Sequence, residues 1–191
     1  SFINQPIFHS TNGHSMRLIE GLMRAKTQGT VRVAVLDTGF TPSNDVIYSD
    51  GYSFSDPIGP EFRNGMGGIC SNMENPDLEK PHGIGVASVA AATPNNGIGM
   101  AGVSPNIELV AGRVGLCEGG AFISEITEGL LWAGGFPTRT GAPEIEPVYI
   151  VNISFGGVGA CPAYLQTAID MVTDRGVTVV IGAGNEGGDT A

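Results

Sequence analysis

Four short apolar runs constrain the fold of this chain more than any other feature. Val and Ile dominate them, and polar or glycine-rich segments follow them, at 31–36, 107–114, 148–154 and 177–181. Strands that are apolar along their whole length are typical of parallel sheets that are covered on both faces. Helical patterns occupy the intervals, at 82–92, 124–133 and 163–175. The sequence therefore predicts a three-layer α/β/α fold around a mostly parallel sheet.

Finer features of these elements can also be predicted. Val86, Val89 and Ala90 share one face of the first helix, and the helical Val, Leu and Ile residues are expected in the core. Ser124 is a plausible N-cap of the second helix, and Gly176 ends the third. Residues 40–80 are polar and predict long loops with one short strand at 51–54.

Length and charge exclude several classes of protein. The 191 residues suit a single domain, 1–191, whose first 30 residues form an N-terminal segment with a hint of an amphipathic helix at Met16, Ile19 and Met23. The net charge of −10, with nine Lys and Arg, argues against a nucleic-acid partner. No apolar run approaches the roughly 20 residues that a membrane helix needs, so no membrane partner is expected.

The stretch Gly182-Ala183-Gly184-Asn185-Glu186-Gly187 follows the last apolar run directly. Its G-x-G-x-x-G spacing fits a dinucleotide-binding turn, which would also need an acidic residue about 20 positions later. The same glycines could instead expose the Asn185 amide to a reacting group. The spacing alone leaves both readings open.

Two further polar residues are candidates for a functional site at the carboxyl edge of the sheet, where ligands bind in such folds. Asp37 ends the first strand, and His82 begins the first helix, 45 residues later. A buried carboxylate can orient an imidazole that acts as a general base, and an amide N–H such as that of Asn185 can stabilise an oxyanion. His9 and His14 have no acidic or cysteine companion at ligand spacing and are expected to be ordinary surface residues.

In this order, "VAVLDTG", "HGIGVASVAA" and "VVIGAGNEG" resemble the subtilisin-like serine proteases (subtilases), as do "NNGIGMAGVSP" and "VNISFGG". The resemblance runs from about residue 31 to the last residue. It implies a subtilisin-like fold, a secreted location, a protein or peptide substrate, and no cofactor for the chemistry. It assigns Asp37 and His82 to a catalytic triad and Asn185 to the oxyanion hole, so the dinucleotide reading is set aside.

The resemblance also implies substrate-binding segments. Ser154, Phe155, Gly156 and Gly157 would form one wall of the specificity pocket, and Gly182, Ala183 and Gly184 the other. Gly119 and Gly120 would offer backbone to which the substrate pairs as an added strand. One departure is local: the family motif continues Gly-Thr-His after the triad histidine, whereas this chain has Gly83-Ile84-Gly85.

A second departure concerns the nucleophile. The family carries its serine in a Gly-Thr-Ser turn, and no Gly-Thr-Ser occurs in this chain. Three explanations stay open: the chain is part of a longer protease, it is the N-terminal piece of a nicked enzyme whose C-terminal fragment is its partner, or it is a non-catalytic peptide-binding relative. The first two predict the N-terminal part of a catalytic domain that is inactive alone.

Cysteines and calcium remain as minor expectations. Of three cysteines, Cys70 and Cys117 could pair with each other and leave Cys161 without an internal partner. In subtilases a loop like "PNNGIG" and an Asp shortly after the triad Asp often hold structural calcium. Asp45 and Asn96 match those positions, with the carbonyls of Ile98 and Met100 as further ligands; a plain turn is the alternative.

Overall fold

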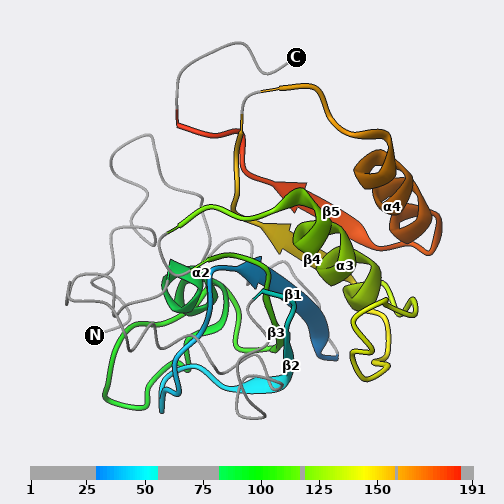
Figure 1. The fold of residues 1–191 in the computed structure, drawn as a ribbon. Coiled ribbons are helices and arrows are strands. Elements are labelled where there is room, and N and C mark those ends of the chain that lie inside the picture. Colours follow the sequence, from blue (N-terminus) through cyan, green and yellow to red (C-terminus); the bar gives the residue numbers. More distant parts are fainter. Residues whose placement is uncertain (1–28, 56–81, 117–118, 158, 186–191) are drawn as a thin grey trace, which may run out of the picture.

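The computed structural model describes residues 29–55, 82–116, 119–157 and 159–185, and Figure 1 shows their arrangement. Within these ranges the chain alternates between strands and helices, as the sequence predicts. In chain order the elements are β1 (Val31–Asp37), β2 (Tyr48–Ser53), α2 (His82–Ala91), β3 (Ile107–Arg113), α3 (Ile123–Ala133), β4 (Ile150–Ile153), α4 (Ala163–Asp174) and β5 (Thr178–Ile181). None of the helices described is long and apolar enough to cross a membrane.

The five strands form one parallel sheet in the order β2-β3-β1-β4-β5, so the predicted parallel sheet is confirmed. Strand β1 is central, and its last residue, Asp37, lies in register with Arg113 of β3. Leu36 lies in register with Ile153 at the end of β4. The carboxyl ends of all five strands therefore meet at one edge of the sheet, where ligands bind in open α/β folds.

Helices cover both faces of this sheet, which gives the three predicted layers. Figure 1 shows α2 on one side of the strands and α3 with α4 on the other. Alternate residues of β1 point to these two layers: Val35 packs with Ala87 of α2, whereas Leu36 packs with Leu130 of α3. A central strand that is apolar throughout is the natural consequence of burial on both faces.

The buried face of α2 differs from the prediction. Gly83 and Ala87 face the sheet, while Val89 is 50% exposed, so the expectation that the helical valines are core is wrong there. The helix approaches the strands through its smallest residues, and this close approach turns Val89 outward. Hydrophobicity predicted the helix correctly but not its rotation.

The start of α3 also differs. The N-cap is Phe122, with an extended backbone, and Ser124 lies one position inside the helix. The carboxylate of Glu125 accepts a hydrogen bond from the Phe122 N–H at 3.3 Å. This contact satisfies the backbone N–H of the cap residue, because an N3 glutamate can reach back to it.

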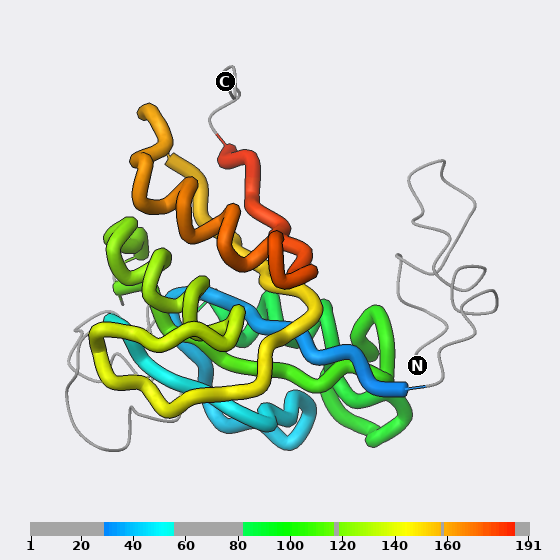
Figure 2. The backbone as a smooth tube through the Cα atoms, turned by 90° about the vertical axis from the view of Figure 1, so that its right-hand side faces the viewer, coloured from blue at the N-terminus to red at the C-terminus, as the bar shows by residue number. Residues whose placement is uncertain are grey.

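Strand β2 is longer than the predicted strand at 51–54 and begins at Tyr48, with an irregular register between Tyr48 and Asp50. The strand is hard to recognise in the sequence because half of its residues are polar, which is possible because it lies at the edge of the sheet. Figure 2 shows the loop between α3 and β4 running alongside β2. Arg32 joins the two, since its guanidinium contacts the Asp50 carboxylate and the Glu146 carbonyl.

Several predictions fall on other parts of the chain. The amphipathic helix at Met16, Ile19 and Met23 lies outside the described residues, as does the pairing of Cys70 with Cys117. Cys161 is exposed and is a free thiol.

Candidate functional site

Asp37 lies at the carboxyl edge of the sheet and has no exposed surface. Its Oδ1 accepts hydrogen bonds from the Thr38 backbone N–H at 2.7 Å and from the Thr38 hydroxyl at 3.2 Å. Its backbone carbonyl accepts from the N–H groups of Val114 and Gly115. These hydrogen bonds hold the carboxyl group and the backbone of Asp37 in one orientation.

His82 begins α2 directly above Asp37. Its Nδ1 lies 3.0 Å from each carboxylate oxygen of Asp37, and its backbone N–H donates to the Thr38 hydroxyl at 3.1 Å. This last bond satisfies one of the N–H groups that an α-helix leaves without a partner at its start. The sequence-predicted Asp37 and His82, 45 residues apart, are thus brought into direct contact.

Glycine at position 83 makes this contact geometrically accessible. A Cβ at Gly83 would lie 2.4 Å from the Gly39 carbonyl oxygen and 2.9 Å from the Asp37 Cβ, both far inside normal contact distance. Gly85, two residues further on, has open space around it. Only the first of the two glycines is therefore required for the approach of helix to strand.

The arrangement has a defined chemical capacity. A carboxylate cannot donate a proton, so Nδ1 of the neutral imidazole must carry the hydrogen, which leaves Nε2 as the acceptor. The His82 side chain is 61% exposed although its partner is fully buried. Nε2 can therefore reach a ligand and take up a proton from it, while Asp37 stabilises the imidazolium that forms.

Two loop segments at the same edge pack against each other. A Cβ at Gly156 would lie 2.6 Å from the Gly184 Cα, and the Gly182 N–H donates to the Ile153 carbonyl. The structure thus brings together the two segments expected as walls of a pocket, with backbone bare of side chains at their contact. Ser154 accepts a hydrogen bond from the Asn152 amide, and Ser154 and Phe155 are half-buried.

Asn185 follows β5 and is exposed. It stands at the same edge of the sheet as Asp37, but β4 lies between their strands. Strands β1 and β5 are therefore separated by two strand spacings, about 10 Å. The oxyanion role of Asn185 stays a prediction.

Gly119 and Gly120 adopt a conformation different from that of an extended edge. Both have positive φ, 89° and 78°, and the Gly120 carbonyl accepts from the Leu116 N–H. An antiparallel bridge between Gly115 and Ala121 flanks this turn. The two glycines are thus not extended in the structure, and their role in pairing with a substrate stays a prediction.

Asp45 and Asn96 are also brought together, as the calcium expectation requires. The Asn96 Nδ2 donates to Asp45 Oδ1 at 2.7 Å, and the Met100 N–H donates to Asp45 Oδ2 at 3.1 Å. The Asn96 Oδ1 accepts from the Ile98 N–H. Both carboxylate oxygens thus accept hydrogen bonds from N–H groups, as in a hydrogen-bonded turn, and the binding of calcium by this loop stays a prediction.

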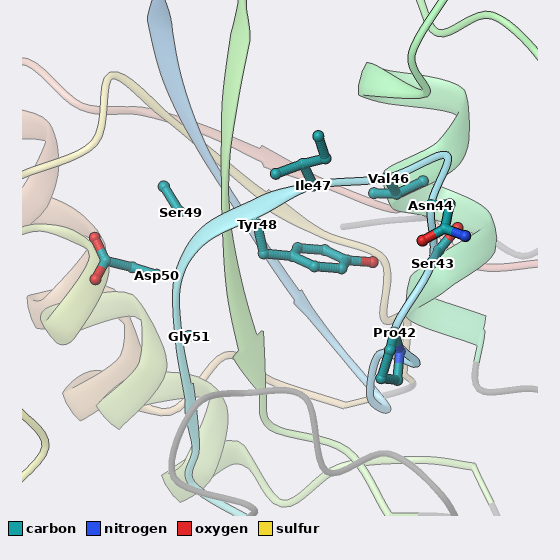
Figure 3. Close-up of a pocket in the computed structure, with 9 residues that line it drawn as sticks. All are labelled: Pro42, Ser43, Asn44, Val46, Ile47, Tyr48, Ser49, Asp50 and Gly51. Carbon is teal, nitrogen blue, oxygen red and sulfur yellow. The ribbon is translucent and has the colours of Figure 1, made fainter. Parts of the chain in front are cut away.

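A separate hollow of about 490 Å³ lies along the segment from Pro42 to Gly51. Figure 3 shows the Tyr48 ring extending toward Pro42 and Ser43, while Ile47 points away. Burial raises the pKa of the Tyr48 phenol. The hollow is at the β2 edge and contains neither Asp37 nor His82, so it is not the place where their chemistry would occur.

Sequence reasoning missed two residues of the site, Thr38 and Arg113. Thr38 contacts both Asp37 and His82, and Arg113 is 2% exposed, with its Nε 3.2 Å from the Thr38 carbonyl. The sequence held a signal for Arg113, because an arginine that directly follows the apolar run 109–112 is expected to be buried and to need hydrogen-bond acceptors.

The site defines a class: an α/β protein with a buried aspartate and an accessible histidine at the carboxyl edge of a parallel sheet. A sequence model described as "Subtilase family" matches residues 28–191. The chain is 36% identical to an alkaline protease of Alkalihalobacillus alcalophilus, over 86% of this chain and 36% of that protein. It is also 36% identical to Subtilisin BL of Lederbergia lenta, over 86% of this chain and 51% of that protein.

A solved structure of a protease from Pseudoalteromonas arctica superposes with a TM-score of 0.78 at 31% identity, over 97% of this chain and 60% of that one. The chain belongs to the subtilase family. It spans about a third to a half of the length of the two curated relatives compared above.

Proposed function

We propose that this chain is the acid–base part of a subtilisin-like serine endopeptidase and that its substrate is protein. The observation that carries the proposal is the contact of His82 Nδ1 with both oxygens of the buried Asp37 carboxylate. In this role His82 takes the proton from a serine hydroxyl as that oxygen attacks the peptide carbonyl, and later returns it to the leaving amine. Asn185 donates a hydrogen bond to the oxyanion that forms.

The serine is proposed to come from polypeptide other than residues 1–191. No Gly-Thr-Ser turn occurs in the sequence, and the relatives compared are longer than this chain. The β5 edge supports a partner there: Val180 and Ile181 are each 49% exposed, although strands of parallel sheets are normally buried. An exposed apolar edge strand favours pairing with a further strand.

The test compares residues 1–191 with the longest product of the same gene. We expect no peptide hydrolysis by 1–191 alone, and hydrolysis by the longer protein that a serine-directed covalent inhibitor abolishes. His82→Ala in the longer protein is the matched control and must remove the activity. Inhibitor-sensitive turnover by purified 1–191, lost in His82→Ala, would refute the proposed division of the triad.

A peptide-binding protein without catalysis is the second candidate, and the absence of the serine motif favours it. The same experiment separates the two. If the longer protein binds a peptide at equilibrium, leaves it intact and contains no Gly-Thr-Ser turn, the non-catalytic function is the correct one.

Secretion and structural calcium belong to the proposal as well. Among the relatives, an "Extracellular basic protease" of Dichelobacter nodosus is 39% identical over 64% of this chain, and its name supports secretion. Asp45 and Asn96 would hold calcium only if the Asn96 amide turned its oxygen toward the ion. Isothermal titration with calcium, compared between wild type and Asp45→Asn, tests this: wild-type binding that Asp45→Asn removes is expected.

A further inference from the structure

Arg113 is a buried cation directly beside the acid–base pair. It ends β3, lies in register with Asp37 of β1 and is 2% exposed. Leu109 and Ala111, which precede it at alternate positions of the strand, pack on the α2 side of the sheet, as Val35 of β1 does. Since side chains alternate along strands, Arg113 and Asp37 emerge next to each other on this same side.

The guanidinium anchors the turn that follows Asp37. Its Nε lies 3.2 Å from the Thr38 carbonyl and 3.4 Å from the Gly115 carbonyl. Directly after Thr38 the chain leaves the strand through Gly39, whose φ of 145° is one that other residues rarely adopt. Arg113 therefore holds the last carbonyl before the chain changes direction.

Thr38 transmits this anchoring to both members of the pair. Its N–H and hydroxyl donate to Oδ1 of Asp37, and its hydroxyl accepts from the His82 backbone N–H. A change in the backbone conformation of Thr38 would thus displace the hydrogen-bond partners of the Asp37 carboxylate and of the His82 N–H together. Because Arg113 of β3 donates a hydrogen bond to the Thr38 carbonyl, such a change in the backbone would break that hydrogen bond.

We propose that Arg113 is a positioning residue: by holding Thr38, it keeps the Asp37 carboxylate aimed at His82 Nδ1 and so maintains the Nδ1–H form of the imidazole. The importance of this for catalysis rests on the proposed function, but the effect on the imidazole does not. The guanidinium suits the task because it donates at fixed angles, and the cost of burying it is offset by its carbonyl acceptors.

The test uses two substitutions of Arg113: one keeps a hydrogen-bond donor at the place of Nε, and the other removes it. The Gln Nε2 stands as many bonds from Cα as the Arg Nε, so Arg113→Gln keeps a donor for the Thr38 carbonyl and removes the charge. Arg113→Met has a similar length and no donor. Val114→Ala is the control for general destabilisation, because Val114 is fully buried but packs on the opposite side of the sheet.

The readouts are the nitrogen NMR shifts of the His82 ring, which report the tautomer, and hydrogen exchange of the His82 backbone N–H. In Arg113→Met we expect a mixture of tautomers and exchange at least ten-fold faster, measured where the variant is fully folded. Arg113→Gln and Val114→Ala should keep the wild-type tautomer. A wild-type tautomer and exchange rate in folded Arg113→Met would overturn the proposal.

If Arg113→Met does not fold, Arg113→Lys replaces it, since Lys keeps the charge but moves the donor one bond further out. Tautomer mixing in Arg113→Lys but not in Arg113→Gln supports positioning by the hydrogen bond; any other result from the pair overturns it. In an active longer protein, Arg113→Met should lower kcat with little change in KM. If that protein shows no protease activity, the proposed function fails while the NMR result still decides the role of Arg113.

Discussion

The carboxyl ends of β1 and β5 lie at the same edge of one sheet, yet their surroundings differ. At β1, Asp37 has no exposed surface; its carboxylate contacts Thr38 and His82 of α2, and its carbonyl accepts hydrogen bonds from the residues that follow β3. At β5, half of the surface of Val180 and of Ile181 is exposed, and the segment that continues to Asn185 is exposed throughout.

The described residues thus enclose Asp37 at the end of β1, which we call the completed side. They leave β5 and the segment after it exposed, which we call the open side. The acid–base pair is preorganised by described residues alone, so its geometry needs no partner. The segments proposed for the pocket and the oxyanion hole stand on the open side, where we propose that further polypeptide packs. The predictions at Asp37, Gly83 and Val180 each test one side of this comparison.

The largest effect is expected at Asp37. If the proposed longer protein is an active protease, Asp37→Asn should lower its kcat by roughly 10⁴-fold, because the amide no longer holds the imidazole in the Nδ1–H form. Steady-state kinetics measure this loss. A reduction of ten-fold or less would mean that the buried contact is structural rather than catalytic.

Gly83 tests how tightly the completed side is packed. Gly83→Ala should destabilise the chain by about 2–3 kcal/mol, since its Cβ would overlap the Gly39 carbonyl and the Asp37 Cβ. Urea denaturation measures the change.

Gly85→Ala is the matched control in the same helix. With open space around it, the new methyl group should stabilise by about 0.5–1 kcal/mol through helix propensity. Equal effects at the two positions would contradict the close approach of α2 to β1.

Val180 tests the open side. Val180→Lys should change the stability of residues 1–191 by less than about 1 kcal/mol, because the side chain is half exposed. In the longer protein the cost should reach about 2 kcal/mol or more if the strand becomes covered there. Gln166→Lys, exposed on α4, adds the same charge and should have a small effect in both proteins. Equal costs of Val180→Lys in the two would show that nothing covers β5.

The smallest effect concerns acid stability at the opposite edge of the sheet, near the start of β1 and β3. The hydrogen bond from Arg32 lowers the pKa of Glu108 below its ordinary value near 4.5. Since the folded pKa is the lower one, the pair stabilises the protein above about pH 4.5, and this contribution is lost as the pH falls through the folded pKa.

Glu108→Gln should therefore cost less than about 1 kcal/mol at pH 7 and nothing at low pH, as thermal unfolding between pH 2 and 7 would show. Glu144→Gln, in the exposed loop before β4, is the control. A cost of Glu108→Gln that persists unchanged at low pH would assign the effect to packing rather than to charge.

Hydrophobic patterns predicted the helices, four of the five strands and the three-layer parallel fold, because burial on two faces imposes such patterns locally; of β2 they predicted only the end. The sequence also indicated Asp37 and His82, since a carboxylate at a strand end and an imidazole at a helix start are placed by those elements. The sequence did not predict which face of α2 is buried, because the close contact of Gly83 with Gly39 depends on two segments that are far apart along the chain.

The side chains that support the contact between Asp37 and His82 could be identified only in the folded structure. Thr38 bonds both Asp37 and His82, and Arg113 reaches Thr38 across a strand boundary. These contacts arise from the register between β1 and β3, which a single sequence does not encode at any one position. The physical reason is that hydrogen bonds are directional and short, so they depend on relative placement, whereas burial of apolar strands does not.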